Sequence, residues 1–310
     1  MAKSTKKTLL LAKIQTAAGT DASPTAAANA ILLRNVTATP LSAEYVERAL
    51  IRPYMGNSGQ IPTTKYAQIE GEVELAGSGA AGTAPAWGPL LRACGFAETV
   101  TASTDVTYAP ISGNFELLTL HYYLDGLFHK IVDARGTVSF DITAKGIPFM
   151  RFRFMGAYSP ITDQSNPTGA DYSAFMKPLG VNKTNTPTWS LDSYTGCLQA
   201  LTFDVANQIE WRSYISCEGA EITNRQPTGN LVLQLPSITD LNWPSLVLTA
   251  AEKALSITHG TTAGNIVTVN LPKTQLTNPS YSDDNNLAML NLDLNINPGQ
   301  GNDEIEIVLT

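Results

Sequence analysis

Lys65-Tyr66-Ala67-Gln68-Ile69-Glu70-Gly71-Glu72-Val73-Glu74-Leu75 is the stretch that decides the fold class. Small or apolar residues alternate with polar ones along it, so every second side chain points to the same side. Glu70, Glu72 and Glu74 share one side, and the apolar residues share the other. This period of two predicts a β-strand with one buried face.

The same order of features recurs in the second half of the chain. The first strand is followed by a glycine-rich link and by Trp87-Gly88-Pro89-Leu90-Leu91. The second copy has an alternating stretch at 229–235, a short link and Leu241-Asn242-Trp243-Pro244-Ser245-Leu246. An arginine-bearing segment precedes each copy, at 50–54 and 210–214. This repetition predicts two copies of one β module.

Length and charge narrow the class of protein. A chain of 310 residues is longer than the chain that usually folds around one hydrophobic core, and its length suits two domains. Residues 1–178 carry 15 basic and 14 acidic side chains, whereas residues 179–310 carry 5 and 13. Because a nucleic-acid binder needs a basic surface to neutralise phosphates, this balance argues against one. It still permits a surface along which nucleic acid passes without sticking.

Cysteine use and the amino terminus indicate the compartment. Cys94, Cys197 and Cys217 are an odd number in a chain with adequate core, so we predict reduced, buried thiols. The apolar run after Lys7 is cut by Lys13, too short for a signal peptide, and no run is long enough to span a bilayer. The sequence therefore predicts synthesis and retention in a cytoplasm, at least until assembly.

Turn signals predict antiparallel hairpins throughout. Asp125-Gly126, Ala144-Lys145-Gly146 and Pro298-Gly299-Gln300-Gly301 each separate two alternating stretches. Residues 83–95 have a helical pattern, and each half has room for only one short helix. Strands joined by hairpins, with few helices, indicate an all-β fold rather than an α/β fold.

The predicted architecture is all-β, with two antiparallel β-sandwich or barrel domains, each with a short flanking helix, and an extended N-terminal arm. The arm covers residues 1–40 and the first domain residues 41–158. Residues 159–188 lose the period of two and collect prolines, which is typical of a linker. The second domain covers residues 189–310.

Motifs for catalysis or cofactor binding are weak. Gly77-Ser78-Gly79-Ala80-Ala81-Gly82 matches the glycine pattern of dinucleotide loops, but Pro85 and Pro89 disturb the helix that such a site requires. We interpret it as a mobile loop. His121 and His129 could face each other across a hairpin and are interpreted as polar neighbours rather than metal ligands. We predict no catalytic residues, no cofactor and no metal.

Two interpretations of the acidic row Glu70, Glu72 and Glu74 remain open. It can be the solvated face of a half-buried strand. Alternatively, it is a negative surface repeated by symmetry, since like charges this close cost stability and their retention calls for a use.

Many short strings of the chain resemble the major tail tube proteins of long, non-contractile bacteriophage tails. The resemblance is carried by Leu10-Leu11-Ala12-Lys13, Gly19-Thr20-Asp21, Arg52-Pro53-Tyr54-Met55-Gly56-Asn57-Ser58-Gly59-Gln60, Val73-Glu74-Leu75-Ala76-Gly77-Ser78-Gly79, Trp87-Gly88-Pro89-Leu90-Leu91-Arg92-Ala93-Cys94-Gly95-Phe96, His129-Lys130, Ala134-Arg135-Gly136, His259-Gly260-Thr261-Thr262-Ala263-Gly264-Asn265, Asn278-Pro279-Ser280-Tyr281 and Gly301-Asn302-Asp303-Glu304. None of these strings is a catalytic signature.

The resemblance implies a structural virion protein that forms stacked rings, with a β-sandwich or barrel wall. DNA and the tape-measure protein would occupy an electronegative lumen. Most such proteins have one tube domain and form hexamers. If both halves here are tube domains, three chains would make a pseudo-hexameric ring. The structural rival is a ring of six in which one half decorates the outside.

The resemblance also suggests sites and partners. Glu70, Glu72 and Glu74 are candidates for the lumen, followed by Asp293, Glu304 and Glu306. The candidate ring-contact loop is Gly77, Ser78, Gly79, Ala80, Ala81 and Gly82, together with the arm. Expected partners are further copies of the chain, the tape-measure protein, the tail terminator and the baseplate or distal tail proteins. DNA would pass without specific binding, no membrane would be involved, and assembly would take place in the host cytoplasm.

Two other classes of protein remain as alternatives. A carbohydrate-binding or adhesive β-sandwich explains the composition but not the repeated plan. A nucleotide-dependent enzyme explains only the glycine loop.

Overall fold

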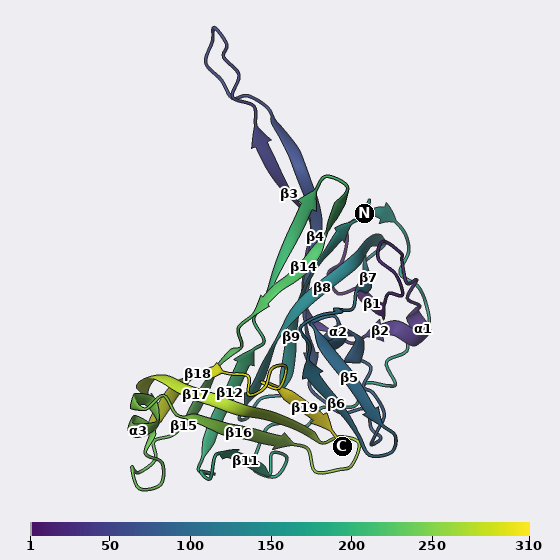
Figure 1. Ribbon diagram of the computed structural model, residues 1–310. Helices are drawn as coiled ribbons and strands as arrows, with labels where there is room; N and C mark the ends of the chain where they lie inside the picture. The colour runs from purple at the N-terminus through teal and green to yellow at the C-terminus, as the bar shows by residue number, and fades with distance from the viewer. Residues whose placement is uncertain (1) are drawn as a thin grey trace.

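A computed structural model describes residues 2–310, and it is almost entirely β (Figure 1). The strands of the first half are β1 (Thr8–Ile14), β2 (Ala30–Ile31), β3 (Arg34–Glu47), β4 (Gln60–Glu74), β5 (Phe96–Thr101), β6 (Asp105–Pro110), β7 (Leu118–Leu124), β8 (Leu127–Thr143) and β9 (Phe149–Tyr158). The remaining strands are β10 (Thr162–Asp163), β11 (Thr188–Leu191), β12 (Leu198–Asp204), β13 (Asn207–Tyr214), β14 (Cys217–Arg225), β15 (Thr228–Gln234), β16 (Glu252–His259), β17 (Val267–Asp284), β18 (Leu287–Ile296) and β19 (Glu306–Leu309). The helices are α1 (Ala26–Asn29), α2 (Gly88–Arg92) and α3 (Trp243–Leu248). The prediction of an antiparallel all-β fold is confirmed.

Eight strands form one continuous antiparallel sheet that runs through both halves. Their order is β3–β4–β9–β8–β12–β15–β18–β17. The pairing of β8 with β12 joins the halves, and there the rings of Phe140 and Phe203 stack with centroids 4.4 Å apart. Four neighbouring strands therefore come from each half.

The two groups of four strands have the same topology, and we call them four-strand sets. In chain order, the first strand pairs with the second, the second with the fourth, and the fourth with the third. The end of the second strand is also equivalent. Leu75 donates its backbone N–H to Pro148 O (2.9 Å), and Leu235 donates to Ala288 O (3.0 Å). The repeat inferred from the sequence is thus present in the strand order.

In each four-strand set a helix follows the second strand, and both helices begin in the same way. Trp87 stands at the N-cap of α2 and Trp243 begins α3, and each helix has a proline in its first turn. Proline suits this position because the first N–H groups of a helix have no partner within it. Gly95 follows α2 with a φ of 80°, a conformation in which glycine ends helices at low cost.

A second layer covers the apolar face of the eight-stranded sheet. It contains β1 and β7, and farther along β5, β6, β19, β16 and β11. The long strands β8 and β17 belong to both layers, since each changes partner along its length. One cluster of buried apolar side chains fills the space between the layers and includes residues of both halves. Residues 8–14 of the predicted arm lie inside this architecture, because β1 pairs with β7 over its full length.

The turn predictions had mixed outcomes. Asp125-Gly126 joins β7 to β8, and residues 144–146 lie in the turn that joins β8 to β9, as predicted. The predicted hairpin across residues 298–301 is wrong, because β18 pairs with β15 and β17 whereas β19 crosses to β6. Alternation identified both strands correctly, but it contains no information about which strand is the neighbour.

Two predictions about single side chains are corrected. All three cysteines are free, but only Cys94 is buried, and Cys197 and Cys217 are exposed. His121 and His129 do not face each other, because His121 pairs with Lys130 and His129 with Tyr122. Within residues 2–310 no helix is long and apolar enough to cross a membrane.

Candidate functional site: a polar sheet face and two projecting hairpins

The face of the eight-stranded sheet that points away from the second layer carries mainly polar side chains, and the base of the β13–β14 hairpin packs on part of it in the first set. Along each strand, alternate residues turn into the core and the rest turn to this face. Two rows of cross-strand neighbours lie on this face, namely Thr37, Glu70, Arg153 and Thr137 in the first set, and Thr202, Asn230, Asp293 and Thr277 in the second. We call this surface the polar face.

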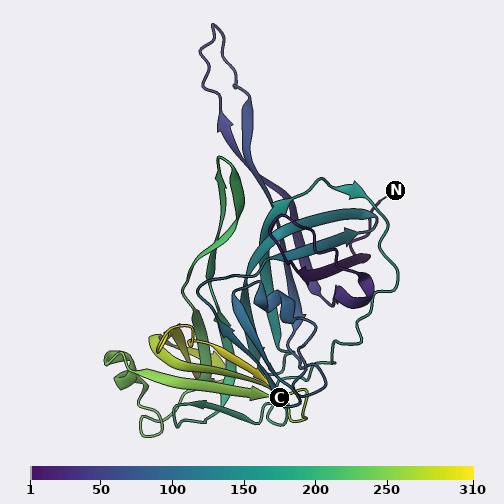
Figure 2. The same cartoon turned by 45° about the vertical axis from the view of Figure 1, so that its right-hand side comes forward.

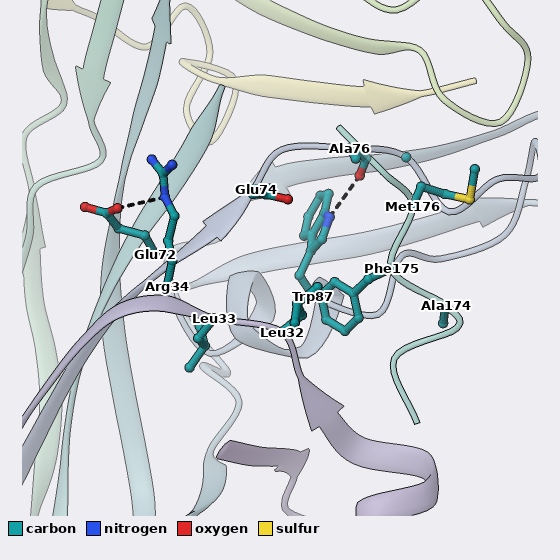
Figure 3. A pocket seen from close by; sticks show the side chains of 11 residues that line it. Leu32, Leu33, Arg34, Glu72, Glu74, Ala76, Trp87, Ala174, Phe175 and Met176 are labelled. Carbon is teal, nitrogen blue, oxygen red and sulfur yellow. Dashed lines mark hydrogen bonds and ion pairs between the residues drawn. The ribbon is translucent and has the colours of Figure 1, made fainter. Parts of the chain in front are cut away.

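Glu72 is the most enclosed acid of the predicted row. Its side chain is only 3% exposed and lies between two arginines. Arg151 donates to Glu72 Oε1 at 2.6 Å, and Arg34 Nε lies 3.0 Å from Oε2 (Figure 3). Burial alone would raise the pKa of Glu72, but the hydrogen bonds from Arg151 and Asn35 and the two positive charges outweigh it and lower the pKa. The Glu72 carboxylate is therefore kept ionised, and the positive charges of Arg34 and Arg151 balance its negative charge.

Glu70 and Glu74 flank Glu72 on β4. Glu70 lies opposite Arg153 in the register with β9, and Glu74 lies opposite Phe149. The guanidinium of Arg34 lies 4.3 Å from the centre of the Phe149 ring. The acidic row is therefore interleaved with arginines, so this half of the polar face is a ladder of both charges rather than a purely negative strip.

The second set presents acids without such partners. Asp293 lies on the polar face and accepts hydrogen bonds from the side chains of Asn230 (3.2 Å) and Asn278 (3.0 Å). Its neighbours on β12, β15 and β18 are Thr, Asn and Asp residues, and none of the described residues on this part of the face is Lys or Arg. This part of the face is therefore negative.

Glu304 and Glu306 lie away from the polar face. Glu304 is 4% exposed and accepts from Arg225 Nε at 2.5 Å, while Arg225 also donates to Ile111 O in the first half. Glu306 starts β19 in the second layer and accepts from Asn270 Nδ2 at 2.8 Å. The Arg225–Glu304 pair thus ties the carboxyl-terminal segment to the first half.

The glycine loop at residues 77–82 packs against the second half of the chain. Gly77 donates its N–H to Asn265 Oδ1 (2.8 Å), and Gly79 donates to Gly264 O (2.8 Å). A Cβ at position 77 would lie 2.2 Å from Gly264 O, and one at 264 would lie 2.4 Å from the backbone of Gly79. Glycine is required here because two backbones touch. We call this contact the glycine seam.

Two hairpins project from the same side of the molecule (Figures 1 and 2). The longer one is β3–β4, whose tip at residues 48–59 is exposed and includes Ile51 and Met55, 104% and 102% exposed. The shorter one is β13–β14, with Ile215 at 98% at its tip. Near its base the ring of Trp211 stacks on Tyr66, with centroids 5.7 Å apart. The large apolar side chains that are fully exposed at these two tips make the tips candidates for contact with another molecule.

A family model described as phage tail tube protein matches residues 5–309. The chain belongs to the phage tail tube protein family. The match spans both halves, so the resemblance inferred from short strings is confirmed, and the chain is a structural protein of the phage tail. A comparison with curated proteins finds no match.

Sequence reasoning missed the projecting hairpins of this tail tube protein. It singled out the arginine-bearing segments at 50–54 and 210–214, and both lie at or next to the tips. The available signal was the concentration of Leu, Ile, Tyr and Met at 50–55, directly before a Gly- and Asn-containing turn. Apolar residues inside a turn have no core to enter, which is a sign of an interaction surface.

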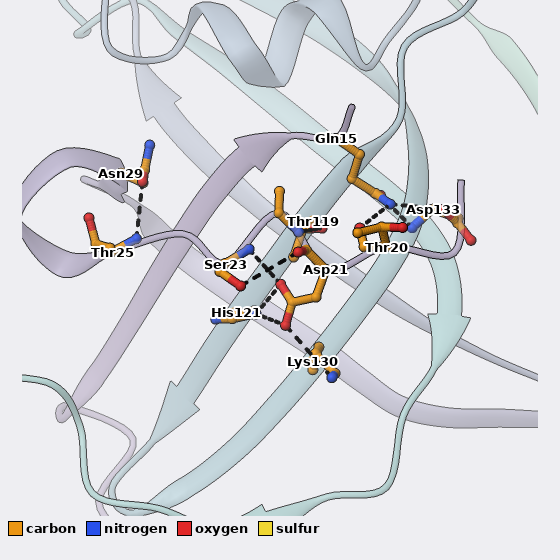
Figure 4. A network of polar contacts seen from close by, with 11 residues as sticks. Gln15, Thr20, Asp21, Ser23, Thr25, Asn29, Thr119, His121, Lys130 and Asp133 are labelled. Atoms are coloured by element: carbon orange, nitrogen blue, oxygen red, sulfur yellow. Dashed lines mark hydrogen bonds and ion pairs between the residues drawn. The ribbon is translucent and has the colours of Figure 1, made fainter. Parts of the chain in front are cut away.

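The remaining polar clusters have structural roles. Asp21 contacts His121 at 3.0 Å and Lys130 at 3.7 Å, which fastens residues 15–22 onto β7 and β8 (Figure 4). Gln15 similarly donates to Asp133 at 2.9 Å. Burial lowers the pKa of His121, against the opposing effect of Asp21. No group of three metal-ligating side chains occurs in the described part of the chain.

A small cavity adjoins the polar face where β3 begins. It measures about 210 Å³ and is lined by Leu32, Leu33, Arg34, Glu72, Trp87 and Phe175, among others (Figure 3). Trp87 is held there by donating Nε1–H to Ala76 O at 3.0 Å. Phe175 comes from the segment between the halves, so this segment packs beside the first set.

Proposed function

We propose that this chain is the repeating subunit of the tail tube wall, and that it assembles into stacked rings through which DNA is ejected into the host. The observation that carries the proposal is the eight-stranded sheet built from two four-strand sets. One face of this sheet borders the core, and the other is the polar face, which carries Glu70, Arg153 and Asp293. Such a sheet suits the wall of a water-filled tube.

The ring consists of three chains. Each chain supplies two equivalent sets, so three chains supply six sets with pseudo-sixfold symmetry. The rival ring of six chains requires one half to lie outside the wall. That arrangement is disfavoured because β8 pairs with β12 and holds both sets in one sheet.

The polar face lines the lumen. Glu70, Glu72, Glu74 and Asp293 lie on this face, whereas Glu304 and Glu306 do not, so the lumen proposal rests on the first four. The carboxylates of the second set repel phosphate, and Arg34 and Arg151 of the first set are already paired with Glu72. DNA can therefore pass without specific binding.

The hairpin tips connect successive rings. Ile51 and Met55 are fully exposed at the tip of the long hairpin, which projects beyond the body of the subunit, and burying them against another ring is favourable (Figure 1). The glycine loop is a secondary candidate for ring contact, since part of it is engaged in the glycine seam. The tape-measure protein inside the lumen, and the terminator and baseplate or distal tail proteins at the tube ends, complete the expected partners. Assembly takes place in the host cytoplasm.

Electron cryomicroscopy of the purified protein tests the proposal. The expected result is rings or hollow tubes with threefold symmetry and with Glu70 and Asp293 facing the lumen. Discrete monomers that bind a carbohydrate would instead support an adhesive module and overturn the tube. A tube with Glu70, Glu72 and Glu74 facing outward would overturn the lumen assignment alone.

A further inference from the structure

Two strands of the eight-stranded sheet have an unpaired edge. β3 pairs only with β4 among the described residues. β17 pairs with β16 as far as Gln275, and from Leu276 to Asp284 it pairs only with β18. A row of unpaired backbone N–H and C=O groups is a template for a further strand. The sheet therefore offers one open edge at each end.

The junction between the two sets shows how such edges meet. β8 ends the first set and β12 begins the second, and they pair with Asp141 opposite Thr202, Phe140 opposite Phe203 and Ser139 opposite Asp204. In the repeat, β17 is equivalent to β8 and β3 to β12. The internal junction is therefore a template for the contact between β17 of one copy and β3 of the next.

The register follows from the cross-strand neighbours. Asp141 lies opposite Phe149, which lies opposite Glu74; Ser282 lies opposite Met289, which lies opposite Gln234. Since Glu74 and Gln234 are equivalent, Asp141 is equivalent to Ser282.

The same procedure assigns the second partner. Thr202 lies opposite Asn230, and Thr37 lies opposite Glu70, four residues before Gln234 and Glu74 respectively. Thr202 is therefore equivalent to Thr37.

We propose that the ring closes through an antiparallel pair between β17 of one copy and β3 of the next, with Ser282 opposite Thr37. In the same register, Tyr281 lies opposite Ala38 and Ser280 opposite Thr39. This inference rests on the proposed function and specifies its partner surface, a second copy of this chain. It extends the polar face across the boundary between copies without a break.

The chemistry of the two edges fits this pairing. Arg34 lies at the start of β3, and Asp283 and Asp284 end β17, so the antiparallel register brings opposite charges together. Pro40 and Pro279 each lie at an irregularity of their strand. Proline on an open edge blocks unrestricted strand addition and limits pairing to the segment beside it. The edges are therefore suited to one register.

Disulfide cross-linking tests the register. Thr37→Cys and Ser282→Cys are introduced together after Cys197→Ser and Cys217→Ser remove the exposed thiols. Directly opposed strand residues have Cα atoms about 4.5–5.5 Å apart, within the range for a disulfide. Oxidised tubes should give covalent dimers and trimers on a non-reducing gel, and nothing larger. The controls are each single cysteine and the out-of-register pair Glu44→Cys with Ser282→Cys, which should remain monomeric.

The outcomes separate this inference from the proposed function. Tubes that form but do not cross-link, or that cross-link equally in the control pair, overturn the register and leave the tube intact. If the unmodified protein forms no rings or tubes, both proposals fail. Hydrogen exchange of the unmodified protein covers the case in which the cysteine variants do not assemble. Amides in residues 34–39 and 280–284 should exchange at least about tenfold more slowly in tubes than in free subunits, and unchanged exchange overturns the pairing.

Discussion

The two four-strand sets have the same strand order but differ in charge. On the polar face of the first set, Glu72 is held between Arg34 and Arg151. At the equivalent place the second set has Val232 on β15, with Asn291 opposite it on β18. The two sets therefore share their strand order, their alternation of core and surface residues and their Trp-Pro helix start, whereas the charge of the polar face differs between them. Side chains on the polar face lie outside the apolar core, so their charge can differ between the sets while the strand order stays the same.

The glycine seam should give the largest effect on stability, because it joins a loop of the first half to a loop of the second half. Gly77→Ala places a methyl group 2.2 Å from Gly264 O, where backbone has to move. We expect a loss of about 3 kcal/mol in the free energy of unfolding, measured by denaturant titration.

Gly113→Ala is the matched control for the seam. Neither Gly77 nor Gly113 has a left-handed φ, and a Cβ at position 113 meets nothing within 4 Å. Gly113→Ala should change the free energy of unfolding by less than about 0.5 kcal/mol. Equal effects of the two substitutions would show that the seam does not depend on close backbone approach.

The charge difference between the sets predicts unequal effects of removing one acid. Glu72→Gln removes the nearly buried carboxylate that the partly exposed Arg34 and Arg151 share, and we expect a loss of about 1–2 kcal/mol in the free energy of unfolding. Asp293→Asn removes an acid that contacts only amides, with an expected change below about 1 kcal/mol. Thermal and denaturant unfolding at neutral pH compare the two variants.

The pH dependence of stability sharpens the same comparison. The pKa of Glu72 is lowered in the folded state from an ordinary value near 4.5, so the unfolded chain binds the proton first as the pH falls. The contribution of Glu72 is complete above pH 4.5 and is lost as the pH falls through the lowered pKa. Glu72→Gln should flatten the stability profile in this acid range. A profile identical to that of the original protein would show that the arginines do not stabilise the ionised carboxylate.

Local signals in the sequence predicted the elements well. Alternation located β4, β9 and β18, and Asp125-Gly126 fixed the turn between β7 and β8. The Trp-Pro segments correctly indicated α2 and α3, although the first half also contains the short helix α1. These features depend on residues close in the chain, whose geometry is set by side-chain period and turn chemistry.

Long-range pairing could not be predicted from the same signals. Ile305, Ile307 and Leu309 alternate like a partner of β18, yet they pair with β6 and β17 in the other layer. Likewise, Glu304 was a candidate for the lumen, whereas Arg225 encloses it. Both outcomes depend on which distant element fills the neighbouring space, and a single sequence does not specify that.

The two hairpins give the prediction with the smallest effect on the fold and the largest on assembly. Ile51→Ser with Met55→Ser removes two fully exposed apolar side chains from the long hairpin, so the free energy of unfolding should change by less than about 0.5 kcal/mol. Tube length seen by electron microscopy should fall sharply, with single rings remaining, because those side chains lose the burial that a neighbouring ring provides. Ile215→Ser at the shorter hairpin is the matched comparison and should shorten tubes less, since that hairpin projects less far. Tubes of full length in the double variant would show that stacking uses another surface, and the glycine loop would then be the favoured candidate.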